Sequence, residues 1–163
     1  MVEAKRLGST ALQDVRASVS TLRSDPLEKI DLPIAINKLA DEFKLSNQIR
    51  PACYLDVPPN LPQPIATTIY RIIQEALTNI SKYAQASEVI IKIQIFSTEL
   101  KLQIIDNGCG FVIDNNMTGF GLQGMRERII SLRGKFEIIS PPNTTSDLPY
   151  LSGCQIIAII PLN

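Results

Sequence analysis

Three polar residues at helical spacing form the first candidate site in the chain. Glu75, Asn79 and Lys82 stand at i, i+4 and i+7, so an ideal helix places them in one row beside its apolar arc. Carboxylate and amide oxygens are ligands that Mg²⁺ accepts, and an ammonium group attracts phosphate. The row is suited to a metal-bound phosphate, but the same spacing also fits a solvated Glu/Lys flank on a surface helix.

A carboxylate at the end of an alternating segment is the second candidate. Leu100, Leu102 and Ile104 point toward the core of the predicted strand, and Asp106 continues that inward direction. A buried carboxylate is costly unless it accepts hydrogen bonds, and the exocyclic amine of a bound base could donate one. The alternative is that Asp106 turns outward and opens an Asp-Asn-Gly turn.

Two groups of glycines follow this carboxylate. Gly108 and Gly110 would let the backbone approach a flat ligand where a Cβ would collide. Gly119 and Gly121 lead into a helix, whose free amide groups and dipole form a natural phosphate site. Neither group is strong evidence in isolation. Their order after the helical row and Asp106 indicates one site that binds a flat base and phosphate.

The elements that must position these residues follow from hydrophobic periodicity and from breaks in the chain. We expect helices at about 7–23, 32–43 and 65–84, and a fourth helix that follows the Gly-rich stretch and ends near 133. Asp31 is the expected cap of the second helix. Strands are expected within 49–57 and at 89–96, 100–105, 136–140 and 154–161, with 89–96 and 100–105 as an antiparallel hairpin. Strands with helices over one face predict an α+β sandwich.

Composition narrows the possible chemistry. The chain has 163 residues, 45% of them hydrophobic, which allows one compact domain with a core of ordinary size. Lys plus Arg and Asp plus Glu both number 16, and no basic run occurs, so direct nucleic-acid binding is not expected. The absence of histidine removes imidazole as base, nucleophile or metal ligand.

The cysteines and the apolar segments indicate the cellular compartment. Three cysteines stand far apart without a CxxC pair, which favours reduced thiols of a cytoplasmic protein over a disulfide framework or a zinc site. The longest apolar stretch, 156–160, is far shorter than a spanning helix needs. We therefore expect no membrane contact by this fragment, although its parent protein could be anchored through a further N-terminal part.

Three stretches resemble the boxes of the GHKL ATP-binding family, which includes histidine kinases, DNA gyrase, MutL-type repair proteins and a class of heat-shock chaperones. RIIQEALTNISK (71–82) resembles the N box, DNGCGF (106–111) the first glycine box and GFGLQGMRER (119–128) the second. The residues of the N box and of the second glycine box are similar to those of sensor histidine kinases that pair with response regulators carrying a LuxR-type DNA-binding domain. The resemblance implies a Bergerat-type two-layer sandwich, with a mixed, mainly antiparallel sheet covered on one face by helices.

The resemblance also implies a role for each matching residue in binding ATP and Mg²⁺. Asn79 would ligate Mg²⁺, Glu75 would support or polarise that site, and Lys82 would approach phosphate. Asp106 would receive the adenine amino group. A lid would be formed by 112–118. The remaining pocket and lid positions are Gly108, Gly110, Phe111, Gly119, Gly121, Leu122 and Gly124.

Two positions depart from the family pattern. Tyr83 stands where the N box usually has histidine, and Cys154 stands where threonine usually lies near the adenine. The first leaves Asn79 and Lys82 intact, so we expect a changed rate before a loss of binding. The second would weaken a water-mediated contact to the base, because a thiol is a poor donor.

The implied reaction needs a partner that carries histidine. LQDVRASVSTLR (12–23) resembles the end of the second dimerisation helix, so 1–25 would be a remnant of that helix and 26–163 the ATP-binding catalytic domain. The γ-phosphoryl group of ATP would pass to a histidine on the dimerisation helices, which form a homodimer in the full-length protein, and then to an aspartate of the response regulator. The fragment alone should bind ATP without phosphorylating itself.

Two other functions remain open at this point. An anti-sigma-type serine kinase shares the same boxes, although the helical stripe at 7–23 argues for a dimerisation bundle instead. A non-catalytic interaction module is the second alternative, in which Tyr83 and Cys154 mark lost activity. Calorimetry with ATP and Mg²⁺ would separate this module from a kinase domain.

Overall fold

The computed structural model describes residues 25–110, 119–140 and 153–163. Three predicted features therefore lie outside the described residues: the helix at 7–23, the lid at 112–118 and most of the loop at 141–153. The described helices and strands are α2 (Leu32–Asn47), β1 (Ala52–Leu55), α3 (Gln63–Asn79), the π-helical turn η1 (Ile80–Ala84), β2 (Val89–Phe96), β3 (Glu99–Asp106), α4 (Phe120–Ser131), β4 (Lys135–Ile139) and β5 (Cys154–Pro161).

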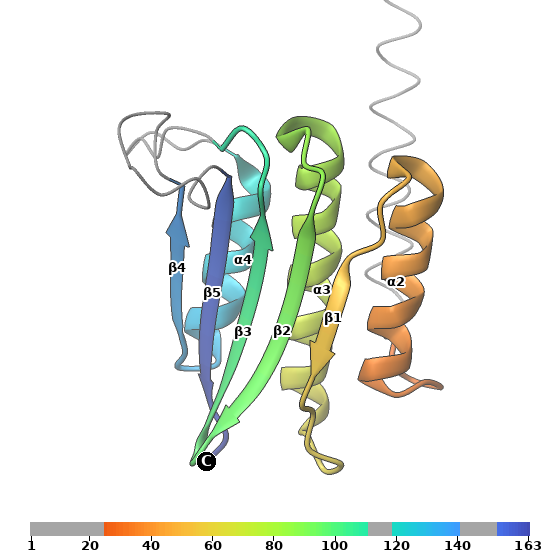
Figure 1. Cartoon of the computed structure of the whole chain (residues 1–163). Coiled ribbons are helices and arrows are strands. Elements are labelled where there is room, and N and C mark those ends of the chain that lie inside the picture. Colours follow the sequence, from red (N-terminus) through yellow and green to blue (C-terminus); the bar gives the residue numbers. More distant parts are fainter. Residues whose placement is uncertain (1–24, 111–118, 141–152) are drawn as a thin grey trace, which may run out of the picture.

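The strands form one five-stranded sheet in the order β1-β2-β3-β5-β4 (Figure 1). β1 pairs with β2 in parallel, and the other neighbours pair in antiparallel fashion. The helices α2, α3 and α4 all lie on the same side of this sheet (Figure 1). The prediction of a mixed, mainly antiparallel sheet with helices over one face is confirmed.

The core lies between this sheet face and the helices. Leu100, Leu102 and Ile104 of β3 are at most 2% exposed, and they alternate with half-buried residues as a strand with one buried face requires. Ile69 and Ile72 of α3 are fully buried against the same core. Burial of each such side chain contributes about 1.5–3 kcal/mol. The core thus fixes the end of β3, which carries Asp106, relative to α3.

The hairpin between β2 and β3 has one-to-one register. Phe96 pairs with Glu99, and Val89 at the other end pairs with Asp106. The connection is Ser97 and Thr98, and Ser97 adopts a positive φ of 55°. Glu99, expected in the turn, belongs to the strand. This register carries Asp106 to the start of β2, close to the end of the α3 region.

All three described helices differ from their predicted limits, and α3 begins two residues early at Gln63 and becomes π-helical after Asn79. α2 continues to Asn47, because the Asn47 side chain donates to the Phe43 carbonyl at 3.0 Å and Gln48 closes the helix in a left-handed conformation. At its start, the side chain of Asp31 makes no capping hydrogen bond, and only its backbone carbonyl accepts from Ala35. α4 begins at Phe120 rather than after Gly124, so two glycines of the Gly-rich stretch are helical. Within the described ranges, no helix has the length and apolarity needed to span a bilayer.

Candidate nucleotide-binding site

Asp106 is buried at the end of β3. Its side chain is 5% exposed, and its Oδ1 accepts a hydrogen bond from the Gly108 N–H at 2.8 Å. Burial raises the pKa of this carboxyl, although hydrogen bonds from the backbone N–H groups of Gly108 and Cys154 act in the opposite direction. The prediction that Asp106 points inward is confirmed, and the alternative of an outward-turned Asp106 is wrong, although its carboxylate makes the i to i+2 bond of an Asp-Asn-Gly turn.

The glycines after Asp106 let the loop pack on the protein's own backbone. A Cβ at Gly108 would overlap the Ala84 carbonyl. Gly110 has a φ of 64°, and a Cβ there would lie 2.9 Å from the Gly153 carbonyl oxygen. These contacts give each glycine a steric reason that is independent of a ligand. The predicted close approach to a bound base stays a prediction.

The helical row ends differently from an ideal helix. Glu75 and Asn79 are half-buried on α3, and the Asn79 side chain has no hydrogen-bond partner in the part of the chain that the structure describes. The next turn, Ile80–Ala84, is π-helical. Because a π turn bonds i to i+5, it is wider than an α turn, and the spacing that aligned Lys82 with Asn79 no longer applies. Lys82 is exposed. Single π turns within helices are frequent at functional sites.

The loop after Asp106 caps this π turn. The Cys109 N–H donates to the Ala84 carbonyl at 2.8 Å, and the Cys109 thiol lies 3.3 Å from the Tyr83 carbonyl oxygen. The Tyr83 ring itself is 71% exposed. Sequence reasoning placed these two segments in one site but gave no contact between them. The structure joins them directly through backbone groups.

The start of α4 lies against the same helix. A Cβ at Gly121 would overlap the carboxylate of Glu75, so the absence of a side chain there lets α4 approach α3. At Gly119 and Gly124 a Cβ would meet nothing within 4 Å. Leu122 is half-buried and packs against the core. The first turn of α4 has no acidic residue and no side-chain cap, so its free N–H groups suit an anion. Phe111 lies outside the described residues.

Cys154 lies opposite Asp106 in the pairing of β3 with β5. Burial and the charge of Asp106 raise the pKa of the Cys154 thiol to about 12. The thiol is therefore protonated at neutral pH and remains a weak neutral donor. Among the residues that the structure describes, no group of three or more His, Cys, Asp or Glu side chains could hold a metal ion. A bound Mg²⁺ would depend on one or two protein oxygens and on substrate phosphates, which is its usual mode with nucleotides.

Comparison with known proteins identifies the family. Residues 65–163 match the family model described as histidine kinase-, DNA gyrase B- and HSP90-like ATPase. The chain belongs to this family. The match begins in α3 and includes every predicted site residue. The GHKL assignment is thus confirmed, and the chain contains an ATP-binding domain of this family.

Curated relatives of this ATPase domain are sensor kinases. The sensor histidine kinase LiaS of Bacillus subtilis is 32% identical over 142 residues, covering 86% of this chain and 38% of LiaS. The histidine-protein kinase/phosphatase DegS of Brevibacillus brevis is 30% identical over 164 residues, covering 97% of this chain and 39% of DegS. The chain therefore spans about two fifths of the length of these relatives.

Solved structures support the same fold. The histidine kinase domain of the blue-light activated histidine kinase EL346 from Erythrobacter litoralis superposes with a TM-score of 0.66 at 17% identity, covering 85% of this chain and 64% of that domain. The Acinetobacter baumannii histidine kinase AdeS gives a TM-score of 0.64 at 18% identity, covering 81% of this chain and 64% of AdeS. At these identities the comparison establishes the architecture of the ATPase domain.

Proposed function

We propose that this domain holds ATP with Mg²⁺ and presents the γ-phosphate to a histidine on the dimerisation helices of a sensor histidine kinase. The observation that carries the proposal is the convergence of three segments. A buried carboxylate acceptor ends β3, its loop caps the π turn after Asn79, and the start of α4 lies against Glu75. Family membership and the names of the curated relatives support the same reaction.

Asp106 recognises the adenine in this proposal. An ionised carboxylate only accepts hydrogen bonds, and it already receives the backbone N–H groups of Gly108 and Cys154. The adenine amino group donates to the remaining capacity of the carboxylate. Cys154 lies beside this position as a protonated thiol, which can donate only weakly in place of a hydroxyl.

Asn79 and its neighbours serve the phosphate end of the nucleotide. Asn79 offers its side-chain oxygen to Mg²⁺, Glu75 holds the adjoining position against Gly121, and Lys82 extends from the π turn toward phosphate. The free N–H groups of α4 supply further donors. Bound Mg²⁺ neutralises the charge that develops during phosphoryl transfer. The domain thus contributes positioning and electrostatics, while the partner contributes the nucleophile.

The partner in this proposal is the dimerisation helix pair of the same protein, followed by a response regulator with a LuxR-type output domain. The chain contains no histidine, so the phosphoacceptor must lie outside these 163 residues. We place the reaction in the cytoplasm, where ATP and the response regulator are both present.

Calorimetric titration with ATP tests the nucleotide site. The parent chain should bind ATP more tightly with Mg²⁺ than without it, and Asn79→Ala should lose most of the metal-dependent gain. Asn37→Ala is the matched control, because Asn37 is a half-buried amide on α2 whose side-chain hydrogen bonds to other described residues go to the Pro33 carbonyl and Arg50. Absence of ATP binding by the folded parent would refute the proposal, and equal metal dependence in Asn79→Ala would remove Asn79 from it.

A further inference from the structure

We infer that Asn107 is a positioning residue of the nucleotide site. Its side-chain amide fastens the loop 106–110 to the residues that connect the π turn with β2, and it thereby holds Asp106 in its binding orientation. The inference rests on the proposed nucleotide site and goes beyond it, because Asn107 contacts none of the proposed ligand-binding side chains in the hydrogen bonds of the described chain.

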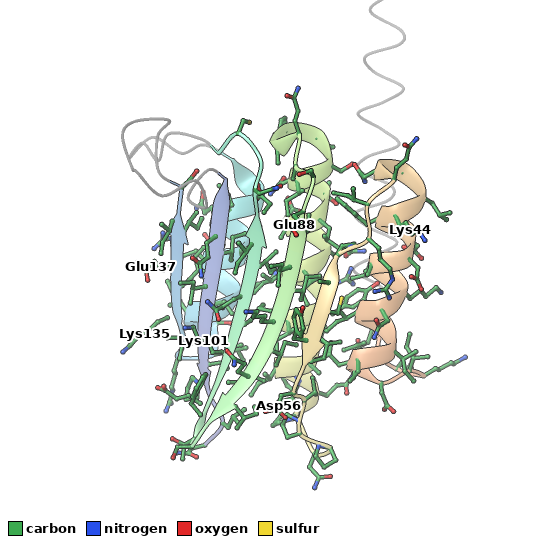
Figure 2. The ribbon with its side chains drawn as sticks, in the orientation of Figure 1. Lys44, Asp56, Glu88, Lys101, Lys135 and Glu137 are labelled. Atoms are coloured by element: carbon green, nitrogen blue, oxygen red, sulfur yellow. The ribbon has the colours of Figure 1, made fainter. Side chains whose placement is uncertain are left out.

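The bonding capacity of Asn107 is directed at two consecutive residues. Its Oδ1 accepts from the Ser87 N–H at 2.9 Å and from the Glu88 N–H at 2.8 Å. Its Nδ2 donates to the Ser87 hydroxyl at 2.9 Å, and its backbone N–H donates to the Glu88 carbonyl at 3.3 Å. Figure 2 marks Glu88 near the start of β2, next to the end of the α3 region. Asn107 thus accepts two hydrogen bonds and donates two, and these four bonds to Ser87 and Glu88 form a specific clamp rather than a solvated turn.

The next two residues of the loop reinforce the clamp. Gly108 packs so closely on Ala84 that a Cβ would overlap the Ala84 carbonyl, and the Cys109 N–H donates to that same carbonyl at 2.8 Å. The last carbonyls of a helix lack partners within the helix, so this donor satisfies a group that the π turn leaves open. Residues 107–109 therefore all contact the segment 84–88.

The clamp reaches Asp106 through Gly108. The Asp106 carboxylate accepts from the Gly108 N–H, and Gly108 is held against Ala84. If Asn107 lost its side chain, the loop would sample more conformations, and a nucleotide would have to order the loop as it binds. That ordering costs affinity. Because Asn107 is exposed and is no part of the hydrophobic core, its removal should affect binding more than it affects folding.

The test compares Asn107→Ala with Asn37→Ala in the whole chain. Both changes delete an amide that makes side-chain hydrogen bonds, but within the described ranges those of Asn37 stay within α2 and with Arg50. Calorimetry with ATP and Mg²⁺ should show affinity about fivefold or more weaker for Asn107→Ala and within about twofold of the parent for Asn37→Ala. Asn107→Asp should recover affinity to within about twofold, because a carboxylate can accept from both N–H groups and from the Ser87 hydroxyl. The melting temperatures of the variants should not follow the order of their ATP affinities.

Amide hydrogen exchange without nucleotide provides a second readout that does not depend on ATP binding. The Cys109 amide should exchange faster in Asn107→Ala, and also in the milder Ser87→Ala, than in the parent. Parent-like ATP affinity in Asn107→Ala, or affinity losses that merely follow the melting temperature in both Asn variants, would overturn the inference. Unchanged Cys109 exchange in both clamp variants would overturn it as well. If the folded, unsubstituted chain did not bind ATP, that result would contradict the proposed function instead.

Discussion

Asp106 is the residue whose placement is hardest to explain without a ligand. Its carboxylate is 5% exposed, burial raises its pKa, and no cation among the described residues contributes to that shift. An asparagine could accept the same hydrogen bond from Gly108 without burying a charge. Ionisable groups with perturbed pKa values are concentrated at functional sites. The proposed acceptor role toward adenine would supply a reason for this placement.

Asp106→Asn should therefore separate binding from stability. The amide can still accept from Gly108, but its NH₂ group would face the adenine amino group with a second donor. We expect ATP affinity to fall by about tenfold or more, with a much smaller change in melting temperature, because removal of a buried charge offsets any weakening of the bond from the Cys154 N–H. Calorimetry and thermal unfolding measure the two effects. ATP affinity equal to that of the parent would exclude Asp106 from base recognition.

The raised pKa of Asp106 also predicts a pH dependence. ATP affinity of the parent should fall as pH is lowered through that raised pKa, because the protonated carboxyl is a poorer acceptor. Stability has the opposite sign, since a pKa raised by folding contributes stability at low pH that is lost as pH rises through the folded value. The parent should therefore gain stability relative to Asp106→Asn toward acid. Titrations and melting curves measured as the pH is lowered from about 7 would show these opposite slopes, and parallel slopes would contradict the assignment.

Two cysteines near the site should differ in reactivity. Burial raises the pKa of Cys154 to about 12, so its thiolate is scarce at pH 8, whereas Cys109 is exposed on the loop that caps the π turn. Iodoacetamide should alkylate Cys109 in the folded chain and leave Cys154 largely unmodified until denaturant is added. ATP with Mg²⁺ should slow the reaction of Cys109. Peptide mass spectrometry reads both sites, and equal native rates would show that Cys154 is not protected as described.

At the level of elements, α4 carries two glycines with opposite surroundings. A Cβ at Gly121 would overlap the Glu75 carboxylate, whereas a Cβ at Gly124 would meet open space. Gly124→Ala should therefore stabilise the helix by about 0.5–1 kcal/mol through propensity alone. Gly121→Ala should be less stable than Gly124→Ala, because the Glu75 side chain must rotate away from the new Cβ. Urea unfolding of the pair provides the measurement, and equal stabilities would mean that α4 does not press on Glu75.

Hydrophobic periodicity was sufficient to predict most of the elements. Alternation placed β2 and β5 at their observed limits, and it placed Asp106 on the buried side of β3. The helical period likewise identified the buried face of α3, including Ile69 and Ile73. In each case many apolar side chains on one face follow the same period. A single residue that departs from the period therefore does not change the predicted element.

The local details of the site were not predictable in the same way. The π turn Ile80–Ala84 is contacted at its end by Gly108 and Cys109, which are distant in sequence. The clamp of Asn107 on Ser87 is equally distant, and the Asn-Gly pair in the sequence indicated only a turn. Register and packing decide these contacts, and no periodic pattern records them. Lys82 was aligned with Asn79 on the assumption of an α-helix that the structure replaces.

For the whole molecule, the site elements meet at one end of the sandwich. At the upper edge in Figure 1, β3 and α3 end and β2, β5 and α4 begin. The opposite end contains the β2–β3 turn and the C-terminus. Charged side chains such as Lys101, Lys135 and Glu137 lie lower on the strands, away from this edge (Figure 2). Under the proposed function, a phosphoacceptor helix would approach this upper edge to reach the γ-phosphate.

Phosphoryl transfer in trans tests the domain as a whole. The chain has no histidine, so alone with radiolabelled ATP and Mg²⁺ it should acquire no phosphohistidine. Addition of a helical hairpin that carries a phosphoacceptor histidine, taken from a protein of the same family, should produce an acid-labile phosphate signal on the hairpin. Asn79→Ala should reduce this signal strongly and Asn37→Ala should not, because only Asn79 lies in the proposed metal site. A phosphohistidine signal on the 163-residue chain itself would contradict the prediction, and transfer that is equal in both variants would separate Asn79 from the reaction.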